Sequence, residues 1–276
     1  MVCLTTEDHA KKFLELMLSR LGFAQSMVEA LCLNVSVGLD TAVAILAACS
    51  GLKYLNMRVP CHLFGKNPIL EPLEKLSRLT ALYVDLASIF NTKVVYLPDV
   101  QVFHSVTHLH LSNAWASWSP VSNSIGLEHL TQITHLSLYL STVRTHPVPL
   151  KEILDRRNLS VLVFWKRSFV SDSAAMQFLE DSNLQDDRVV VLDEGLFRHH
   201  MLDDRFWECA ERVVKQRQES GGEYEIIPNS PWHRLIPRSS YIRQQPHRAL
   251  RCRACQYRIP LRDRMECRDR CGLGVQ

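Results

Sequence analysis

The sequence lacks the short motifs that mark the common catalytic sites. It contains no G-x-S-x-G, no H-E-x-x-H, no phosphate-binding Gly-Lys loop and no dinucleotide-binding G-x-G-x-x-G. Its acidic pairs, such as Asp186-Asp187 and Asp203-Asp204, lie beside expected helix ends or turns, where capping and solvation explain them. We therefore expect that the protein is not an enzyme.

Long apolar runs and an N-terminal targeting signal are also missing. The longest strongly apolar stretch, residues 41–49, is far shorter than the roughly 20 residues that a membrane-spanning helix needs. The start MVCLTTEDHAKK has no basic segment followed by an apolar run. Cys32 and Cys49 lie in apolar periodic segments, where reduced cysteine behaves as a small hydrophobe. These features predict an intracellular protein, cytoplasmic or nuclear, with no membrane partner.

What the chain does contain is a period. Apolar doublets recur at spacings of 24, 27, 27, 27 and 26 residues, and most have an apolar residue three positions earlier. The doublets are Leu31/Leu33, Leu55/Met57, Leu82/Val84, Leu109/Leu111, Leu136/Leu138 and Leu162/Phe164. A period of about 20–29 residues on L-x-x-L-x-L is typical of leucine-rich repeats. The pattern predicts an α/β fold, an irregular solenoid with parallel strands on a concave face and helices or loops on a convex face. A seventh strand is expected over residues 188–192.

The repeat sextets resemble the leucine-rich repeat superfamily. They are LKYLNM (52–57), LTALYV (79–84), VTHLHL (106–111), ITHLSL (133–138) and LSVLVF (159–164). With DDRVVVLDEG (186–195) and DRFWECAERVVKQRQ (204–218), they are similar to basidiomycete fungal F-box/leucine-rich repeat proteins. In such families the repeats recognise a partner and an N-terminal F-box docks a cullin-type ubiquitin ligase.

That resemblance implies a protein-protein interaction module, the substrate-recognition part of an F-box-type ubiquitin ligase receptor or a truncated relative of one. Ligase subunits would then be among the partners. No F-box-like segment precedes the first repeat, so a stand-alone repeat protein stays open.

One repeat position departs from the family pattern. Asn or Cys usually stands there and bonds the backbone of the turn, whereas this chain has Pro60, Ala87, Ala114, Ser141 and Arg167. We expect no ladder of buried side-chain bonds at that position, so the turns must satisfy their backbone in another way.

Two domains are expected. Residues 1–218 form the solenoid, with a helical cap over Glu7–Leu21 that Gly22 ends and a second cap over Arg205–Gln218. Residues 219–276 form a tail with 11 Arg, no Lys and six acidic residues. Because this tail is rich in Pro, Arg, Ser and Gln and has almost no apolar periodicity, we expect disorder.

The candidate partner-binding residues lie between the inward-pointing leucines, on the concave face. They are Tyr54, Arg58, Tyr83, Asp85, His108, His110, His135, Tyr139 and Trp165. Aromatic residues with polar tips are enriched at protein interfaces. The alternative is an ordinary sheet face that is solvated or covered by a helix. A metal bound by the three histidines is disfavoured, because the repeat itself explains their alignment.

The tail carries a separate chemical signal. Cys252, Cys255, Cys267 and Cys271 have spacings compatible with tetrahedral zinc, and arginines crowd the same segment. Zinc-dependent or nucleic-acid binding through the tail is therefore the alternative function. A disordered arginine-rich tail with chance cysteines is favoured over it, and no cofactor is expected.

Overall fold

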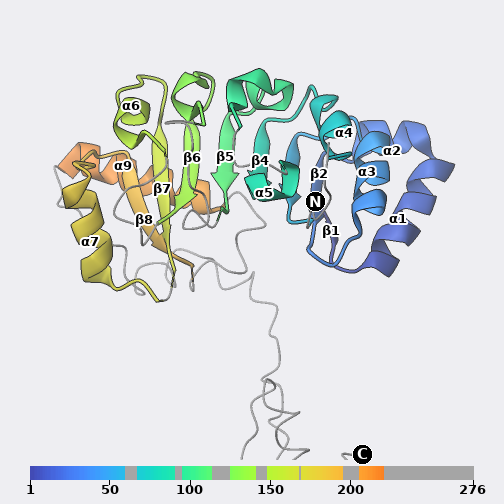
Figure 1. Ribbon diagram of the computed structural model, residues 1–276, viewed down its shortest axis with the longest axis horizontal. Coiled ribbons are helices and arrows are strands. Elements are labelled where there is room, and N and C mark those ends of the chain that lie inside the picture. The colour runs from blue at the N-terminus through green and yellow to red at the C-terminus, as the bar shows by residue number, and fades with distance from the viewer. Residues whose placement is uncertain are drawn as a thin grey trace, which may run out of the picture. The chain divides into compact units, whose positions relative to one another are not determined.

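One parallel sheet of eight strands runs through the computed structural model (Figure 1). The structure describes residues 1–59, 67–90, 95–113, 125–140, 148–167, 169–194 and 205–220. The chain divides into two units, Met1–Pro228 and Asn229–Gln276, and every described residue belongs to the first unit. The predictions for the tail beyond Ser220, its four cysteines included, lie outside the described residues.

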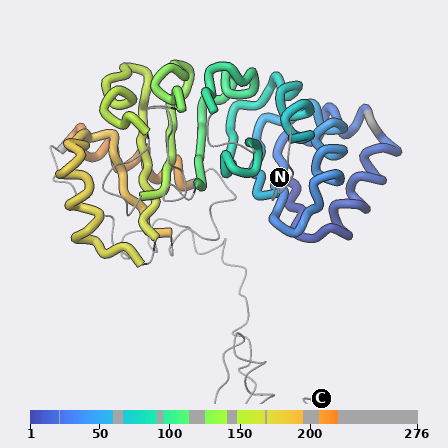
Figure 2. Tube along the Cα trace, in the orientation of Figure 1, coloured from blue at the N-terminus to red at the C-terminus, as the bar shows by residue number. Residues whose placement is uncertain are grey.

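Each strand pairs with the next one along the chain, so the strand order in the sheet equals the chain order (Figure 2). The strands are β1 (Val2–Leu4), β2 (Ala30–Leu33), β3 (Tyr54–Met57), β4 (Ala81–Val84), β5 (His108–Leu111), β6 (His135–Tyr139), β7 (Val161–Lys166) and β8 (Val189–Asp193). Equivalent positions of successive repeats are register partners, as Tyr83, His110 and Ser137 are. The pairing confirms the α/β class, the parallel strands and the predicted alignment of side chains.

Short helices connect the strands. The α-helices are α1 (Glu7–Ser19), α2 (Leu21–Met27), α3 (Leu39–Ala48), α4 (Leu70–Glu74), α5 (Leu86–Ile89), α6 (Leu150–Leu154), α7 (Asp172–Asp181) and α9 (Arg205–Ser220), and the 3-10 helices are η1 (Leu97–Asp99), η2 (Gln101–His104) and η4 (Leu127–His129). Among these helices of the described ranges, none combines the length and the apolar character needed to cross a bilayer.

The repeat leucines form the core on one side of the sheet. The first leucine of each doublet is at most 1% exposed, from Leu31 in β2 to Leu162 in β7. On the same side, Phe164 packs edge-on against Phe178 of α7, with ring centroids 5.8 Å apart. The connecting helices therefore cover the side of the sheet to which the doublets point.

The N-terminal segment differs from the prediction in two ways. β1 adds an edge strand before the first repeat, paired with β2. The amphipathic segment that begins after the cap residue Thr6 is also not one helix, because α1 ends at Ser19 and Gly22 lies inside α2. A strand of three residues is too short to show an alternating pattern.

Glu7 fastens α1 to the start of α3. Its carboxylate accepts a hydrogen bond from the backbone N–H of Gly38 and another from the hydroxyl of Thr41, each 2.6 Å long. The Thr41 hydrogen bond and then the Gly38 hydrogen bond lower the pKa of Glu7. Because these residues are more than 30 positions apart in the chain, the contact holds two packed helices in place.

A ladder of threonines joins the starts of successive strands. The hydroxyls of Thr80, Thr107 and Thr134 each donate to the backbone carbonyl 27 residues earlier, at 3.1, 3.2 and 3.3 Å. These threonines recur with the period of the repeat, directly before the strand residue that starts each pairing. Each of these carbonyls also accepts two backbone N–H groups from the start of the next strand, so the threonine hydroxyl adds a third hydrogen bond to it.

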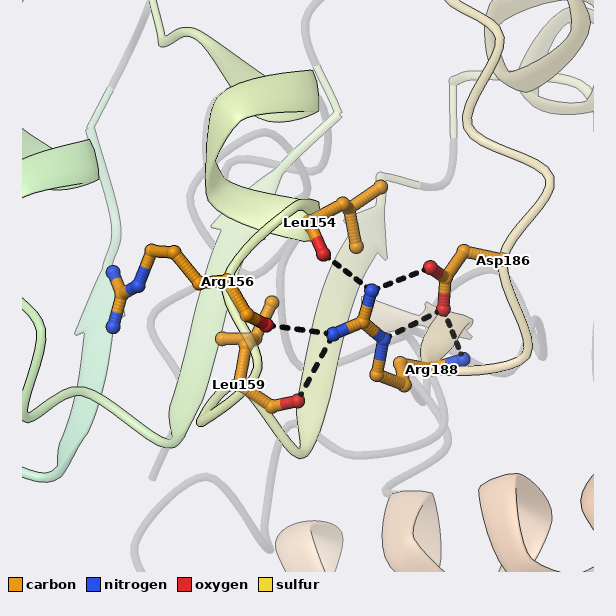
Figure 3. A network of polar contacts seen from close by, with 5 residues as sticks. All are labelled: Leu154, Arg156, Leu159, Asp186 and Arg188. Atoms are coloured by element: carbon orange, nitrogen blue, oxygen red, sulfur yellow. Dashed lines mark hydrogen bonds and ion pairs between the residues drawn. The ribbon is translucent and has the colours of Figure 1, made fainter.

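Arginine side chains bond backbone carbonyls in the return segments, the stretches that connect the end of one strand to the start of the next (Figure 3). The guanidinium of Arg188 donates to the carbonyl oxygens of Arg156 at 2.9 Å and Leu159 at 3.3 Å, and also to that of Leu154. Its ion pair with Asp186, 2.6 Å long, raises the pKa of Arg188 and lowers that of Asp186. One planar side chain thus satisfies three carbonyls of the preceding return segment.

The same arrangement occurs one repeat earlier. Arg156 donates to the carbonyls of Leu127 at 3.2 Å and Ile133 at 2.7 Å. In the repeat before that, Gln132 donates to the carbonyl of Phe103. Long side chains from one return segment therefore bond the carbonyls of the previous segment.

One buried amide bond occurs beside the turn position at which no such bond is expected. Asn113 is 1% exposed, and its Oδ1 accepts a hydrogen bond of 3.0 Å from the backbone N–H of Leu86, 27 residues earlier. It lies one position before Ala114, which, like Pro60 and Ser141, lies outside the described residues.

Candidate binding surface

The sheet face opposite the repeat leucines carries the aromatic side chains that the sequence assigned to partner binding. We call it the histidine face, and its members are Tyr54, Tyr83, His108, His110, His135, Ser137, Tyr139 and Trp165. Tyr83 and His110 are register partners with ring centroids 5.3 Å apart, and Tyr54, whose register partner is Ala81, lies diagonally to Tyr83 with ring centroids 5.1 Å apart. His110 is only 2% exposed and Trp165 is fully buried, so this face is covered.

The cover is α9, drawn in orange in Figure 1, which packs against β7 and β8. Phe206, in its first turn, is fully buried among the rings of Tyr83, His110 and Trp165, at centroid distances of 5.9, 6.4 and 5.3 Å. The sequence predicts this helix as the C-terminal cap of the solenoid. It packs on the last two strands, and its aromatic residues also extend over the sheet face as far as Tyr83 of β4.

A second group of contacts joins α9 to the paired histidines of β5 and β6. The rings of His108 and His135 are stacked, with centroids 4.1 Å apart and an interplanar angle of 6°. Trp207 lies edge-on to both, at 5.7 and 5.4 Å. The Nε2 atom of His135 lies 2.9 Å from a carboxylate oxygen of Glu211. One turn of α9 therefore supplies both an apolar and a polar contact to this pair.

Ser137 fixes the orientation of the central histidine. Its hydroxyl oxygen accepts a hydrogen bond of 2.6 Å from the indole N–H of Trp165 and lies 2.9 Å from Nδ1 of His110. A serine hydroxyl donates one hydrogen bond and accepts two, so Ser137 can bond Trp165 and His110 at the same time.

The three histidines are neutral near pH 7. Burial lowers the pKa of His110 to about 3, with a smaller contribution from the charge of Arg58. Burial and then His135 lower the pKa of His108 to about 4. Burial also lowers the pKa of His135, against the opposing effect of its hydrogen bond to Glu211. The histidine face therefore offers aromatic surface rather than positive charge.

The nine predicted partner residues fall into two groups. Tyr83, His108, His110, His135 and Trp165 all contact α9. These five residues therefore fit the alternative to partner binding, which is a sheet face covered by a helix of the same chain. Of the other four, Tyr54 is 7% exposed, and the remaining three, Arg58, Asp85 and Tyr139, lie in a cleft at the ends of the strands.

This cleft, which we call the strand-end cleft, has a volume of about 460 Å³. Its lining residues are Asn34, Val35, Arg58, Asp85, Ser88, Ser112, Tyr139 and Arg167. Most of them stand at or directly after the carboxyl end of a strand, one strand after another from β2 to β7. Parallel strands end at the same edge of a sheet, so residues from repeats far apart in sequence meet there.

Aromatic contacts order one end of the cleft. The guanidinium carbon of Arg167 lies 4.8 Å from the ring centroid of Tyr139 and 6.0 Å from that of Phe169. The hydroxyl of Tyr139 donates to a carboxylate oxygen of Glu194 at 3.4 Å. Burial, and secondarily the Glu194 charge, raise the pKa of Tyr139 to about 12, so the phenol stays protonated. Arg167 thus lies over a neutral aromatic ring.

Asp85 supplies the negative charge of the cleft. Its carboxylate caps α5 by accepting a hydrogen bond of 2.9 Å from the backbone N–H of Ala87. Burial raises its pKa, whereas the hydrogen bond from Ala87 and the charge of Arg167 act in the opposite direction. The carboxylate therefore has a structural partner and stands beside a cation.

No group of three or more potential metal ligands occurs in the described ranges. His108, His110 and His135 are instead engaged with one another, with Ser137 and with α9. The cysteines proposed for zinc lie beyond Ser220 and have no described position.

Comparison of the chain with protein-family models, with curated proteins and with solved structures finds no match.

The sequence indicated only part of the lining of the strand-end cleft. The sequence indicated Arg58, Asp85, Tyr139 and Trp165 as candidate binding residues, but it placed Arg167 at the turn position. β7 is longer than the strands before it, ending at Lys166, so Arg167 rather than Trp165 reaches the cleft. The strand ends could be aligned from the period, but the length of each strand could not.

Proposed function

We propose that the chain is a protein-protein interaction module, built as an irregular leucine-rich repeat solenoid, that binds its partner at the strand-end cleft. The observation that carries this proposal is the cleft itself, to which consecutive strand ends contribute polar, charged and aromatic side chains. Arginine and tyrosine, both present in it, are enriched at the residues that dominate binding energy in interfaces.

The cleft is a better partner site than the histidine face. α9 buries Phe206 and Trp207 there and belongs to the same chain, so its effective concentration at the face is high. A partner would have to displace the helix before it reached the histidines. By contrast, Arg58 is exposed and Arg167 is half-buried, so both are accessible at the strand ends.

We further propose that the partner is a substrate of a ubiquitin ligase, with this chain as the recognition part of an F-box-type receptor or as a truncated relative of one. The support is the resemblance of the repeat sextets to that group of proteins, together with the parallel sheet in chain order. Recovery of ligase subunits with the full chain would support this assignment, and recovery of partners without any ligase subunit would favour a stand-alone repeat protein.

The test is affinity capture with the full chain and quantitative identification of bound proteins. The double variant Arg58→Ala/Arg167→Ala removes two cations of the cleft. Arg212→Ala removes an exposed cation of α9 and is the matched control. We expect partners that are retained by the control and lost with the double variant. If both variants retain the same partners, the cleft is not the binding site.

A further inference from the structure

Two free cysteines lie side by side across the first pair of strands. Cys3 of β1 and Cys32 of β2 are register partners, and each is a free thiol. Cys3 is exposed, whereas Cys32 is only 5% exposed. Register partners of a sheet point to the same face, so the two side chains are neighbours on that face.

The spacing of the strands suits a covalent bond between these cysteines. Neighbouring strands lie about 4.8 Å apart, and the Cα atoms of a disulfide are usually roughly 4.4–6.8 Å apart. The pairing continues on both sides of the cysteines, from Val2 with Leu31 to Leu4 with Leu33. The backbone therefore holds Cys3 and Cys32 at a separation that a disulfide requires.

The two thiols differ in their environment. Burial raises the pKa of the Cys32 thiol to about 12, and the neighbouring Cys3 thiol adds to this increase, whereas the charge of Arg58 acts in the opposite direction. Cys32 therefore keeps its proton near pH 7, and the exposed Cys3 is the thiol that an oxidant in solution reaches first. The other two free cysteines of the described ranges, Cys49 and Cys209, are buried and lie outside the strands.

We propose that Cys3 and Cys32 form a redox-active dithiol, which a hydroperoxide oxidises to a disulfide between β1 and β2. This modification site is independent of partner binding at the strand-end cleft. An accessible thiol with a second thiol beside it is typical of redox-sensitive pairs. In a reducing compartment, disulfides of this kind are transient and usually serve redox sensing or catalysis.

The oxidation takes place in two steps. The sulfur of Cys3 attacks the terminal oxygen of the hydroperoxide, so an S–O bond forms and the O–O bond breaks. The peroxide is reduced to an alcohol, which takes the proton of the Cys3 thiol, and Cys3 becomes a sulfenic acid. The sulfur of Cys32 then attacks the sulfur of Cys3, so the S–S bond forms and the S–O bond breaks. The departing hydroxide takes the proton of Cys32 and leaves as water.

The disulfide holds the edge of the sheet. β1 is the first strand in the sheet order, and a strand of three residues is held there by few hydrogen bonds. The bond also closes the part of the chain that contains α1 and α2, which restricts the unfolded state. Oxidation therefore makes local opening of β1 less frequent.

The test is a disulfide map of the full chain after treatment of the folded protein with hydrogen peroxide. Free thiols are alkylated in urea, the monomer band of a non-reducing gel is digested with trypsin, and the peptides are identified by mass spectrometry. Cleavage after Lys11 and Arg20 separates the two cysteines, so their disulfide appears as two joined peptides. We expect Cys3 and Cys32 to lose their free thiols together and dithiothreitol to restore both. Cys49, in the same tryptic peptide as Cys32, is the internal control and stays alkylated.

Variants separate the two steps. In Cys32→Ser, oxidation of Cys3 stops at the sulfenic acid, which dimedone labels, whereas the unaltered protein loses this label as the disulfide forms. Cys209→Ala is the matched control, and it forms the disulfide as the unaltered protein does. Hydrogen exchange in β1 should become slower after oxidation, and exchange in β8 should stay unchanged.

The peptide map of the unaltered protein decides the proposal without depending on the folding of any variant. A Cys3 that is oxidised to sulfinic or sulfonic acid while Cys32 remains free overturns it. A disulfide of Cys3 with a cysteine other than Cys32, or equal losses of free Cys32 and Cys49, overturns it as well. Unchanged exchange in β1 after the disulfide has formed contradicts the hold on the edge strand.

Discussion

Removing the side chain of Phe206 tests whether α9 is a fixed part of the folded unit. Phe206 is fully buried between rings from three strands, and truncation of a buried phenylalanine to alanine typically costs about 3–5 kcal/mol of unfolding free energy. For a unit of this size, that corresponds to a decrease in melting temperature of roughly 10 °C. We therefore expect Phe206→Ala to be strongly destabilised.

The measurement is urea unfolding of the full chain, followed by far-ultraviolet circular dichroism. Lys215→Ala is the matched control, because Lys215 lies on the same helix with a side chain that is 76% exposed. Its substitution should change the unfolding free energy by no more than about 0.5 kcal/mol. Equal stability of the two variants would refute the docking of α9 on the histidine face.

A second readout shows whether α9 unfolds alone. If its docking is the weakest part of the unit, Phe206→Ala accelerates hydrogen exchange in α9 and β8 and leaves exchange in β2 and β3 unchanged. If the unit unfolds cooperatively, exchange accelerates throughout. Either result is compatible with docking, and unchanged exchange in α9 contradicts it.

Three further substitutions test other contacts, each by urea unfolding. Because His110 is neutral when folded and has a pKa of about 3, whereas the unfolded histidine titrates near 6.5, stability is lost as the pH falls below 6.5. His110→Gln should reduce the loss between pH 7.5 and 5 by about 2 kcal/mol, and an unchanged pH dependence would refute the buried neutral ring. Arg188→Met should cost about 1–3 kcal/mol because three carbonyls and Asp186 lose their partner. Arg188→Lys should restore only part of this stability, and full restoration would show that charge alone matters. Thr107→Val should cost about 1 kcal/mol, and a cost no greater than that of Thr131→Val at an exposed turn would remove the ladder as a source of stability.

The period of the sequence was sufficient to predict the sheet. Because each repeat contributes one strand at one interval, Leu82, Leu109 and Leu136 had to fall in register if any pair of strands did. The same argument aligned His108 with His135. These predictions are confirmed because they depend only on local spacing and on pairing between neighbours, which a solenoid-like sequence repeats.

The position of α9 could not be predicted in the same way. The amphipathic pattern of 205–218 indicated that Phe206 and Trp207 would be buried, but it did not indicate against which surface. Their partners in β4, β5 and β6 lie roughly 70 to 120 residues earlier in the chain, and no local pattern records such a contact. The aromatic character of both surfaces was visible, since Phe and Trp on the helix match Tyr, His and Trp on the sheet. A helix that buries two large aromatic residues needs a surface with the area to receive them, and a sheet face offers more area than the edge of a single strand.

The docking of α9 changes what the histidines mean for function. As exposed residues they would bind a partner directly, whereas His110, buried against Phe206 and bonded to Ser137, contributes to the folded state. Arg167 differs, because its contacts are to side chains at the rim of the cleft and its loss leaves the packing of α9 intact. Substitutions at the histidine face should therefore lower the melting temperature and reduce partner capture together. Substitutions of the cleft arginines should reduce capture while the melting temperature stays within a few degrees of the unaltered protein. A variant of His110 that kept its melting temperature and lost the partner would place the binding site back on the histidine face.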